Sequence, residues 1–280
     1  MPALAKPKKK LYNDAKVHGV SGQGRQPILL NLNKPMADFA IRVGSHTAQG
    51  VRPNNEDRLV VDPDNHLYMV ADGMGGQDHG ERASGLAAEI IPRVVHDRLK
   101  AKDEADSAVK RALEEANQAI IDASRDQPLG RRMGTTTVLA LENNGQVFVA
   151  GIGDSRAYLI RDNKVEQLTV DHSVAQALVS SGAITIEEAR TSPWQNVLHK
   201  FLGCANMIEG PDVLPFTPQA GDRLLLASDG LTNYVTPEDL RAGATSFNDP
   251  QSWVEHLVKL ALERGSRDNV TGIVIFFEAT

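Results

Sequence analysis

Apolar residues recur along the chain at two spacings, and each spacing predicts a different kind of element. In two long stretches, 80–99 and 103–124, alanine, leucine, isoleucine and valine recur every three or four residues, which predicts amphipathic helices. The other apolar runs are short and end at Asn, Asp, Gly or Pro, which predicts strands joined by turns. The predicted strands are residues 39–43, 58–62, 67–71, 135–141, 147–151, 157–160, 165–168, 223–228 and 270–277.

The order of these elements favours layers over repeated strand–helix–strand units. Most strands follow one another directly, and the helical patterns are segregated, with a further amphipathic helix at 250–264 before the last strand. We therefore expect an α+β fold. Residues 172–210 interrupt the pattern with two short helical stretches, 173–180 and 186–190, on an irregular background.

Charge is distributed unevenly along the chain. Residues 1–37 lack an apolar period and predict an N-terminal extension, followed by one domain at 38–280. The 280 residues carry a net charge of −6, but residues 1–34 hold seven basic residues and one acidic residue, so the remainder carries −12. The acidic charge of these remaining residues disfavours the binding of nucleic acid and favours the binding of divalent cations. The basic extension is either a solvated tail or an arm for an acidic partner.

The compartment can be inferred from what the sequence does not contain. The apolar runs are far shorter than the ~20 residues of a membrane-spanning helix. Lysines near the N-terminus leave no room for the apolar core of a signal peptide, and the single cysteine, Cys204, cannot form an internal disulfide. We expect a cytoplasmic protein with neither a membrane nor a nucleic-acid partner.

Five aspartates stand at the ends of predicted strands, four of them beside Gly, Asn or Ser: Asp57, which follows Asn54-Asn55-Glu56, and Asp72, Asp154, Asp229 and Asp268. Each alone is consistent with an ordinary turn. Gathered at the ends of buried strands, however, their carboxylates would be desolvated and would repel one another. A divalent cation relieves both costs, and hard oxygen ligands favour Mg²⁺ or Mn²⁺ over zinc.

Two neighbouring features fit a phosphate-handling site. Gly73 follows Asp72 and lacks a side chain, so its carbonyl can approach a metal ion closely. Arg52 lies five residues before Asp57, and its guanidinium offers a planar fork to phosphate oxygens. A phosphomonoester needs both a metal and an anion clamp for hydrolysis.

Seven short motifs then occur in order along roughly residues 39–278. They are RPNNED (52–57), ADGMGG (71–76), GTT (134–136), GDSRAY (153–158), LTVDHS (168–173), ASDGL (227–231) and RDNVT (267–271). The ordered set resembles the metal-dependent protein phosphatase family, type 2C, in its bacterial form. The resemblance implies a four-layer α-β-β-α sandwich of two antiparallel sheets flanked by helices.

The resemblance also implies an activity and its partners. A member of this family hydrolyses phosphoserine and phosphothreonine with a water activated by a binuclear Mn²⁺ or Mg²⁺ centre. The partners would be phosphoprotein substrates, the targets of a cognate bacterial Ser/Thr kinase, and the chain would be a monomer.

By motif, the resemblance assigns the metal ligands. Asp72 bridges the two ions. Asp229 and Asp268 hold one of them, and the Gly73 carbonyl holds the other. Asp57 acts mostly through metal-bound water, and Asp154 with Asp229 holds a weaker third ion.

The remaining roles fall outside the metal cluster. Arg52 binds the substrate phosphate, and residues 172–210 form a flap beside the site. One departure concerns the position after Asp72-Gly73, where some members carry a histidine proposed as the general acid. Here it is Met74, which has no proton to give, so a metal-bound water is the expected donor. We favour a flap-anchoring role over an acid role for His172.

Two other functions remain as alternatives. A phosphatase-like regulator that binds partners without turnover would be expected to lack some metal-binding aspartates, and here each is present. An esterase of the Gly-Asp-Ser type would use Ser155 as its nucleophile. No histidine in the chain has an aspartate three residues before it, so the base expected for that enzyme is missing.

Overall fold

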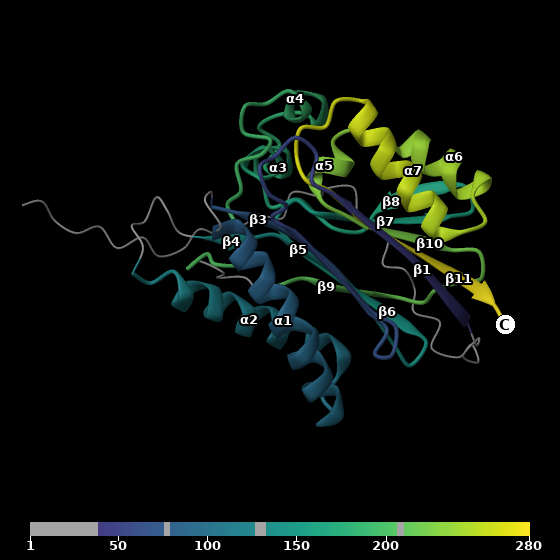
Figure 1. The fold of residues 1–280 in the computed structure, drawn as a ribbon, viewed down its shortest axis with the longest axis horizontal. Coiled ribbons are helices and arrows are strands. Elements are labelled where there is room, and N and C mark those ends of the chain that lie inside the picture. Colours follow the sequence, from purple (N-terminus) through teal and green to yellow (C-terminus); the bar gives the residue numbers. More distant parts are fainter. Residues whose placement is uncertain (1–38, 76–78, 127–132, 206–209) are drawn as a thin grey trace, which may run out of the picture. The chain divides into compact units, whose positions relative to one another are not determined.

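The structure is a computed structural model that describes residues 39–75, 79–126, 133–205 and 210–280 (Figure 1). The extension expected at 1–37 lies outside these residues, so the domain boundary at residue 38 stays a prediction. None of the described helices is both long and apolar enough to cross a bilayer.

Two antiparallel sheets form the centre of the fold. The first sheet runs in the order β1 (Phe39–Ala48), β11 (Val270–Ala279), β10 (Arg223–Ala227), β7 (Arg156–Arg161) and β8 (Lys164–Gln167). The second runs β2 (Asp57–Asp62), β3 (Leu67–Met74), β5 (Thr137–Asn143), β6 (Gln146–Ile152) and β9 (Val213–Phe216), with β4 (Gly134–Thr135) paired to β3.

Helices cover the outer faces of both sheets (Figure 1). Helices α1 (His79–Lys100) and α2 (Ala105–Ala123) pack on the second sheet. On the first sheet lie α5 (Asp229–Thr232), α6 (Pro237–Ser246) and α7 (Pro250–Glu263). The predicted flap contains α3 (Val174–Ser180) and α4 (Ile186–Arg190).

Three apolar cores separate these four layers. Strand β3 shows why, because successive side chains of a strand point to opposite faces. Met69 packs with residues of α1 and α2, whereas Val70 packs with the core between the sheets. The third core joins the first sheet to α7 through Trp253, which is fully buried. The α-β-β-α sandwich implied by the resemblance is confirmed.

The structure also contains elements that the apolar pattern did not predict. Helix α6 buries only Leu240 and Gly243, so its apolar period is weak. Its signal is instead the capping box at its N-terminus, formed by Thr236 and Asp239, with Pro237 in the first turn. Strand β9 includes a proline, which is tolerated because β9 is an edge strand.

Candidate metal centre

The five aspartates predicted from the sequence come to one edge of the sandwich. In antiparallel sheets the start of one strand lies beside the end of its neighbour. Asp57 begins β2 and stands opposite Asp72, near the end of β3. Asp229 begins α5, two residues after the last residue of β10, while Asp154 and Asp268 each stand two residues before a strand, β7 and β11. We call these five residues the site aspartates.

Asp57 joins the two sheets. Its side chain is buried, at 2% exposure, and Ser228 Oγ, directly after β10, donates to Asp57 Oδ2 over 2.9 Å. The other oxygen, Oδ1, is buried and has no hydrogen-bond partner among the described residues. A buried carboxylate oxygen without a partner is costly, and a cation would satisfy it.

Burial and mutual repulsion shift the titration of the site aspartates. Burial, followed by the neighbouring carboxylates, raises the pKa of Asp57 to about 7 and that of Asp72 well above its usual range. The same causes raise the pKa of Asp154 to about 7. Burial and Asp268 raise the pKa of Asp229. The negative charges lie close enough to disfavour one another, which is the electrostatic setting of a cation site.

Arg52 reaches this group from the loop before β2. Its Nη2 donates to Asp268 Oδ2 over 2.6 Å, and this hydrogen bond raises the pKa of the guanidinium. Both residues line a pocket of about 390 Å³ together with Asp229 and Arg267. The structure therefore places the predicted phosphate-binding arginine in the same pocket as two predicted metal ligands.

The site aspartates do not fully enclose a position for a metal ion in this arrangement. Within the part of the chain that the structure describes, no group of three or more His, Cys, Asp or Glu side chains is arranged to hold one. Asp268 is engaged by Arg52, and the carboxyls of Asp72 and Asp229 hydrogen-bond to each other. Hard oxygen donors, the unsatisfied Oδ1 of Asp57 and the raised pKa values still fit Mg²⁺ or Mn²⁺.

Gly73 is buried in β3 and packs against α1. A Cβ on Gly73 would come within 2.1 Å of the Gly80 carbonyl oxygen, so only glycine permits this close packing. The next residue, Met74, pairs with Gly134 at the end of β3 and is partly buried.

His172 is hydrogen-bonded to the residue before Asp154, which favours the predicted flap-anchoring role over an acid role. The backbone N–H of Gly153 donates to His172 Nδ1 over 3.0 Å, and the His172 N–H donates to the Gly153 carbonyl over 2.8 Å. Burial lowers the pKa of His172 to about 4, so the ring is neutral near pH 7 and its Nδ1 can accept.

Two residues of the motifs have roles that the sequence reasoning missed. Asn269 Oδ1 accepts from the Glu56 N–H over 2.8 Å, and its Nδ2 donates to the carbonyls of Gln49 and Asn54 at 2.9 Å each. It thereby holds the loop that carries Arg52. Ser228 is the hydroxyl partner of Asp57. Both stand directly beside a site aspartate, but adjacency alone does not reveal a bond to a distant segment.

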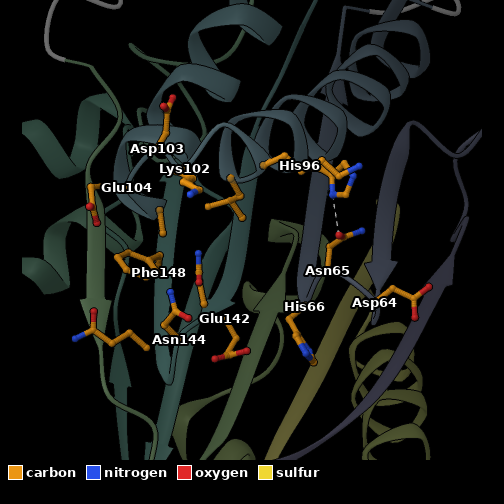
Figure 2. Close-up of a pocket in the computed structure, with 15 residues that line it drawn as sticks. Asp64, Asn65, His66, His96, Lys102, Asp103, Glu104, Glu142, Asn144 and Phe148 are labelled. Atoms are coloured by element: carbon orange, nitrogen blue, oxygen red, sulfur yellow. Dashed lines mark hydrogen bonds between the residues drawn. The ribbon is translucent and has the colours of Figure 1, made fainter. Parts of the chain in front are cut away.

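A larger pocket, of about 800 Å³, lies at the opposite end of β3 (Figure 2). It is lined by the turn before β3, which holds Asn65 and His66, and by the connection between α1 and α2. His96 Nδ1 and Asn65 Oδ1 are 2.8 Å apart in its wall. Acidic and basic side chains are mixed here, and no predicted site residue lines the pocket, so we do not place the chemistry there.

Comparison with known proteins agrees with the geometry. A model of the family Protein phosphatase 2C matches residues 44–270. Serine/threonine phosphatase Stp of Listeria welshimeri is 33% identical over 231 residues, covering 80% of this chain and 91% of its own. Protein phosphatase PhpP of Streptococcus pneumoniae is 36% identical over 225 residues, covering 79% and 90%.

A solved structure of a similar protein contains metal ions. The catalytic domain of serine/threonine protein phosphatase PstP, in complex with two manganese ions, matches with a TM-score of 0.71 and 32% identity. The match covers 86% of this chain and 100% of that one. With the edge of clustered carboxylates, these matches place the chain in the protein phosphatase 2C family, as a divalent-metal-dependent protein serine/threonine phosphatase that acts on phosphoproteins.

Proposed function

We propose that the site aspartates and the Gly73 carbonyl hold two Mn²⁺ or Mg²⁺ ions, with a weaker third ion at Asp154 and Asp229. The observation that carries the proposal is the buried, unpartnered Oδ1 of Asp57, which stands opposite Asp72 on paired strands. A carboxylate pair in that setting is stable only when protonated or bound to a cation.

The chain's own groups have separate tasks in this proposal. Bound cations would supply a water of lowered pKa as the nucleophile and offset charge on the phosphoryl oxygens. Ser228 orients Asp57 through its hydroxyl. Among the described residues, the Arg52 side chain donates only to Asp268, through Nη2, so its other N–H donors are available for phosphate. Met74 has no proton to donate, so the leaving group receives its proton from another source.

The proposal also covers the substrates, the oligomeric state and the cellular location. We assign as substrates the targets of a cognate Ser/Thr kinase, because two curated relatives are named as serine/threonine phosphatases. We also propose a monomer in the cytoplasm. Light scattering of the purified chain and fractionation of the source cells test these two statements.

The esterase alternative conflicts with the position of its nucleophile. Ser155 is 2% exposed, and its Oγ is 2.6 Å from Thr136 Oγ1. A buried hydroxyl in that bond cannot reach an ester. The regulator alternative is not favoured, since the site aspartates converge and the relatives are named as phosphatases.

Asp57→Asn and Asp72→Asn test the metal assignment. Each substitution keeps the side-chain volume and removes a charge. We expect Mn²⁺ binding by calorimetry to weaken, and turnover of a phosphothreonine peptide to fall by more than the ~10–100-fold typical of an outer-shell change at a metal site.

The matched control is Asp106→Asn, a partly exposed aspartate in the first turn of α2 that pairs with Lys110. It should behave like the parent protein. If Asp57→Asn and Asp72→Asn retain parental Mn²⁺ affinity and turnover with an unchanged circular dichroism spectrum, the assignment is wrong.

A further inference from the structure

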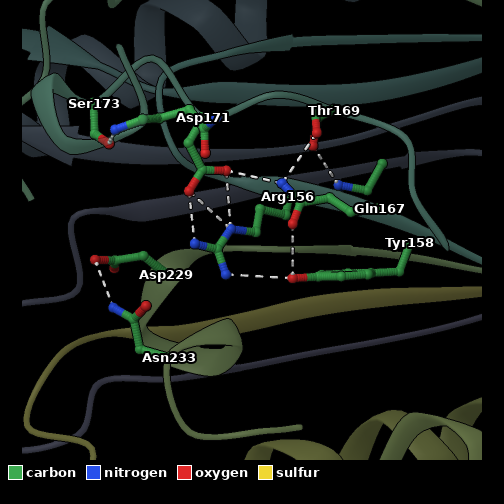
Figure 3. Close-up of polar contacts among 10 residues, drawn as sticks. Arg156, Tyr158, Gln167, Thr169, Asp171, Ser173, Asp229 and Asn233 are labelled. Atoms are coloured by element: carbon green, nitrogen blue, oxygen red, sulfur yellow. Dashed lines mark hydrogen bonds and ion pairs between the residues drawn. The ribbon is translucent and has the colours of Figure 1, made fainter. Parts of the chain in front are cut away.

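Arg156 and Asp171 form a forked ion pair beside the site (Figure 3). Arg156 stands two residues after Asp154. Its Nε donates to Asp171 Oδ1 over 2.9 Å and its Nη2 to Asp171 Oδ2 over 2.6 Å. Gln167 Nε2 donates to the same carboxylate over 2.9 Å. The two paired side chains are largely buried, at 21% and 12% exposure, so the fork is geometrically fixed.

The residue before Asp154 is held by the residue after Asp171. Gly153 and His172 exchange two hydrogen bonds, one from each backbone N–H. Gly153 has φ +99°, a conformation that favours glycine, and a Cβ there would lie 2.6 Å from Thr136 Cγ2. Asp154 is thus held in place on both sides along the chain. Gly153 on one side binds His172, and Arg156 on the other side binds Asp171.

His172, directly after Asp171, begins the flap, and residues 197–199 within the flap return to its start. The His199 N–H donates to the His172 carbonyl over 2.9 Å, and the Val174 N–H donates to the Val197 carbonyl over 2.8 Å. Both ends of the segment between His172 and His199 are therefore fastened at one point. That point is bonded directly to the loop that carries Asp154.

We propose that Asp171 and His172 form a clamp that fixes the Asp154 loop and the base of the flap relative to each other. Asp171 is then a positioning residue for the site. It acts through Arg156 and touches neither metal nor substrate. The effect on metal binding rests on the proposed role of Asp154, whereas the mechanical link between flap and loop does not.

The chain offers a matched control at the other end of the same strand. Arg161 ends β7 and forms an equivalent fork with Asp222, in which Nε donates to Oδ1 over 2.8 Å. Its side chains are as buried, at 23% and 2% exposure. Asp171→Asn and Asp222→Asn each break one buried forked pair, but only the first loosens the proposed clamp.

Hydrogen exchange of the protein without added metal tests the link itself. We expect Asp171→Asn to increase the exchange of peptides that contain Gly153, His172 and His199 by at least tenfold. In Asp222→Asn these peptides should exchange at the parental rate, measured at equal temperature below the unfolding transition. Parental exchange in Asp171→Asn, or the same increase in both variants, overturns the clamp.

The manganese dependence of activity tests what the clamp does to metal binding at the site. The Mn²⁺ concentration that gives half-maximal turnover should rise several-fold in Asp171→Asn, with most of kcat recovered at saturating Mn²⁺. Asp222→Asn should keep the parental concentration. An exchange effect without a Mn²⁺ effect would retain the mechanical clamp and refute the metal role of Asp154, so the two failures are distinguishable.

Discussion

Asp57 and Asp239 carry the same carboxyl group in opposite settings. Asp57 is buried among other carboxylates, and burial raises its pKa to about 7. Asp239 accepts from the Arg264 guanidinium and caps α6, and the Arg264 hydrogen bond holds its pKa well below the usual range. Neighbours contributed by other segments decide whether an aspartate favours its charge or resists it.

Arg52→Ala tests the phosphate contact at this scale. Charge-assisted hydrogen bonds contribute about 1.5–3 kcal/mol, so we expect KM for a phosphothreonine peptide to rise roughly 10–100-fold, with a smaller change in kcat. Steady-state kinetics at saturating Mn²⁺ measure both. Arg93→Ala, an exposed arginine on α1, is the control. An unchanged KM would exclude Arg52 from the phosphate site.

At the scale of elements, helix ends are stabilised by side chains from neighbouring segments. The capping box of Thr236 and Asp239 satisfies backbone N–H groups at the start of α6, where the helix has no internal acceptors. Arg264, at the end of α7, donates to Asp239 Oδ1 over 2.9 Å and to the Tyr234 carbonyl over 2.7 Å. One aspartate therefore joins the start of one helix to the end of the next.

Asp239→Asn should destabilise the fold without acting on the site. Loss of the cap costs about 0.5–2 kcal/mol, which corresponds to a decrease of about 1–8 °C in Tm for a chain of this size. Differential scanning calorimetry measures it, and Glu238→Gln, an exposed neighbour, is the control. Since Asp239 has a lowered folded-state pKa, its stabilisation is present above pH ~4 and disappears at lower pH. Equal Tm values at pH 7 would contradict this role.

At the scale of the whole molecule, the site works against the stability of the metal-free fold. Asp57 and Asp154 keep protons up to pH about 7 when folded. In the unfolded chain, aspartates lose their protons near pH ~4. Between these values the folded state binds more protons than the unfolded state, so the free energy of unfolding falls as pH rises.

Metal-free protein should therefore lose stability from about pH 4 to about pH 7, the interval between the unfolded-chain pKa and the raised folded-state values. Mn²⁺ binds the deprotonated carboxylates, so its stabilising effect should grow over the same interval. Urea unfolding in EDTA and in Mn²⁺, at each pH, measures both. Asp57→Asn should flatten the pH dependence of the EDTA series. A metal-free stability that rises throughout the interval would contradict the linkage.

Much of the architecture could be predicted from the chain alone. Periodic apolar residues predicted α1, α2, α7 and most strands, because those elements bury one face in a core. The prediction failed for α6 and β9, which bury few apolar side chains. It also ended β3 at Ala71, although the strand continues through Asp72 and Gly73 to Met74. Polar strand residues give no apolar signal, and here those residues belong to the site.

The sequence by itself determined which residues carry the chemistry, since carboxylates at strand ends and an ordered motif set depend only on residue type and order. Only the tertiary structure decided which of them meet. Asp57 is bonded to Ser228, 171 positions away, and Asp154 is bracketed by residues of the flap base. Register and sheet packing select these partners, and both follow from how the apolar faces pack together. No local pattern of residues encodes that packing.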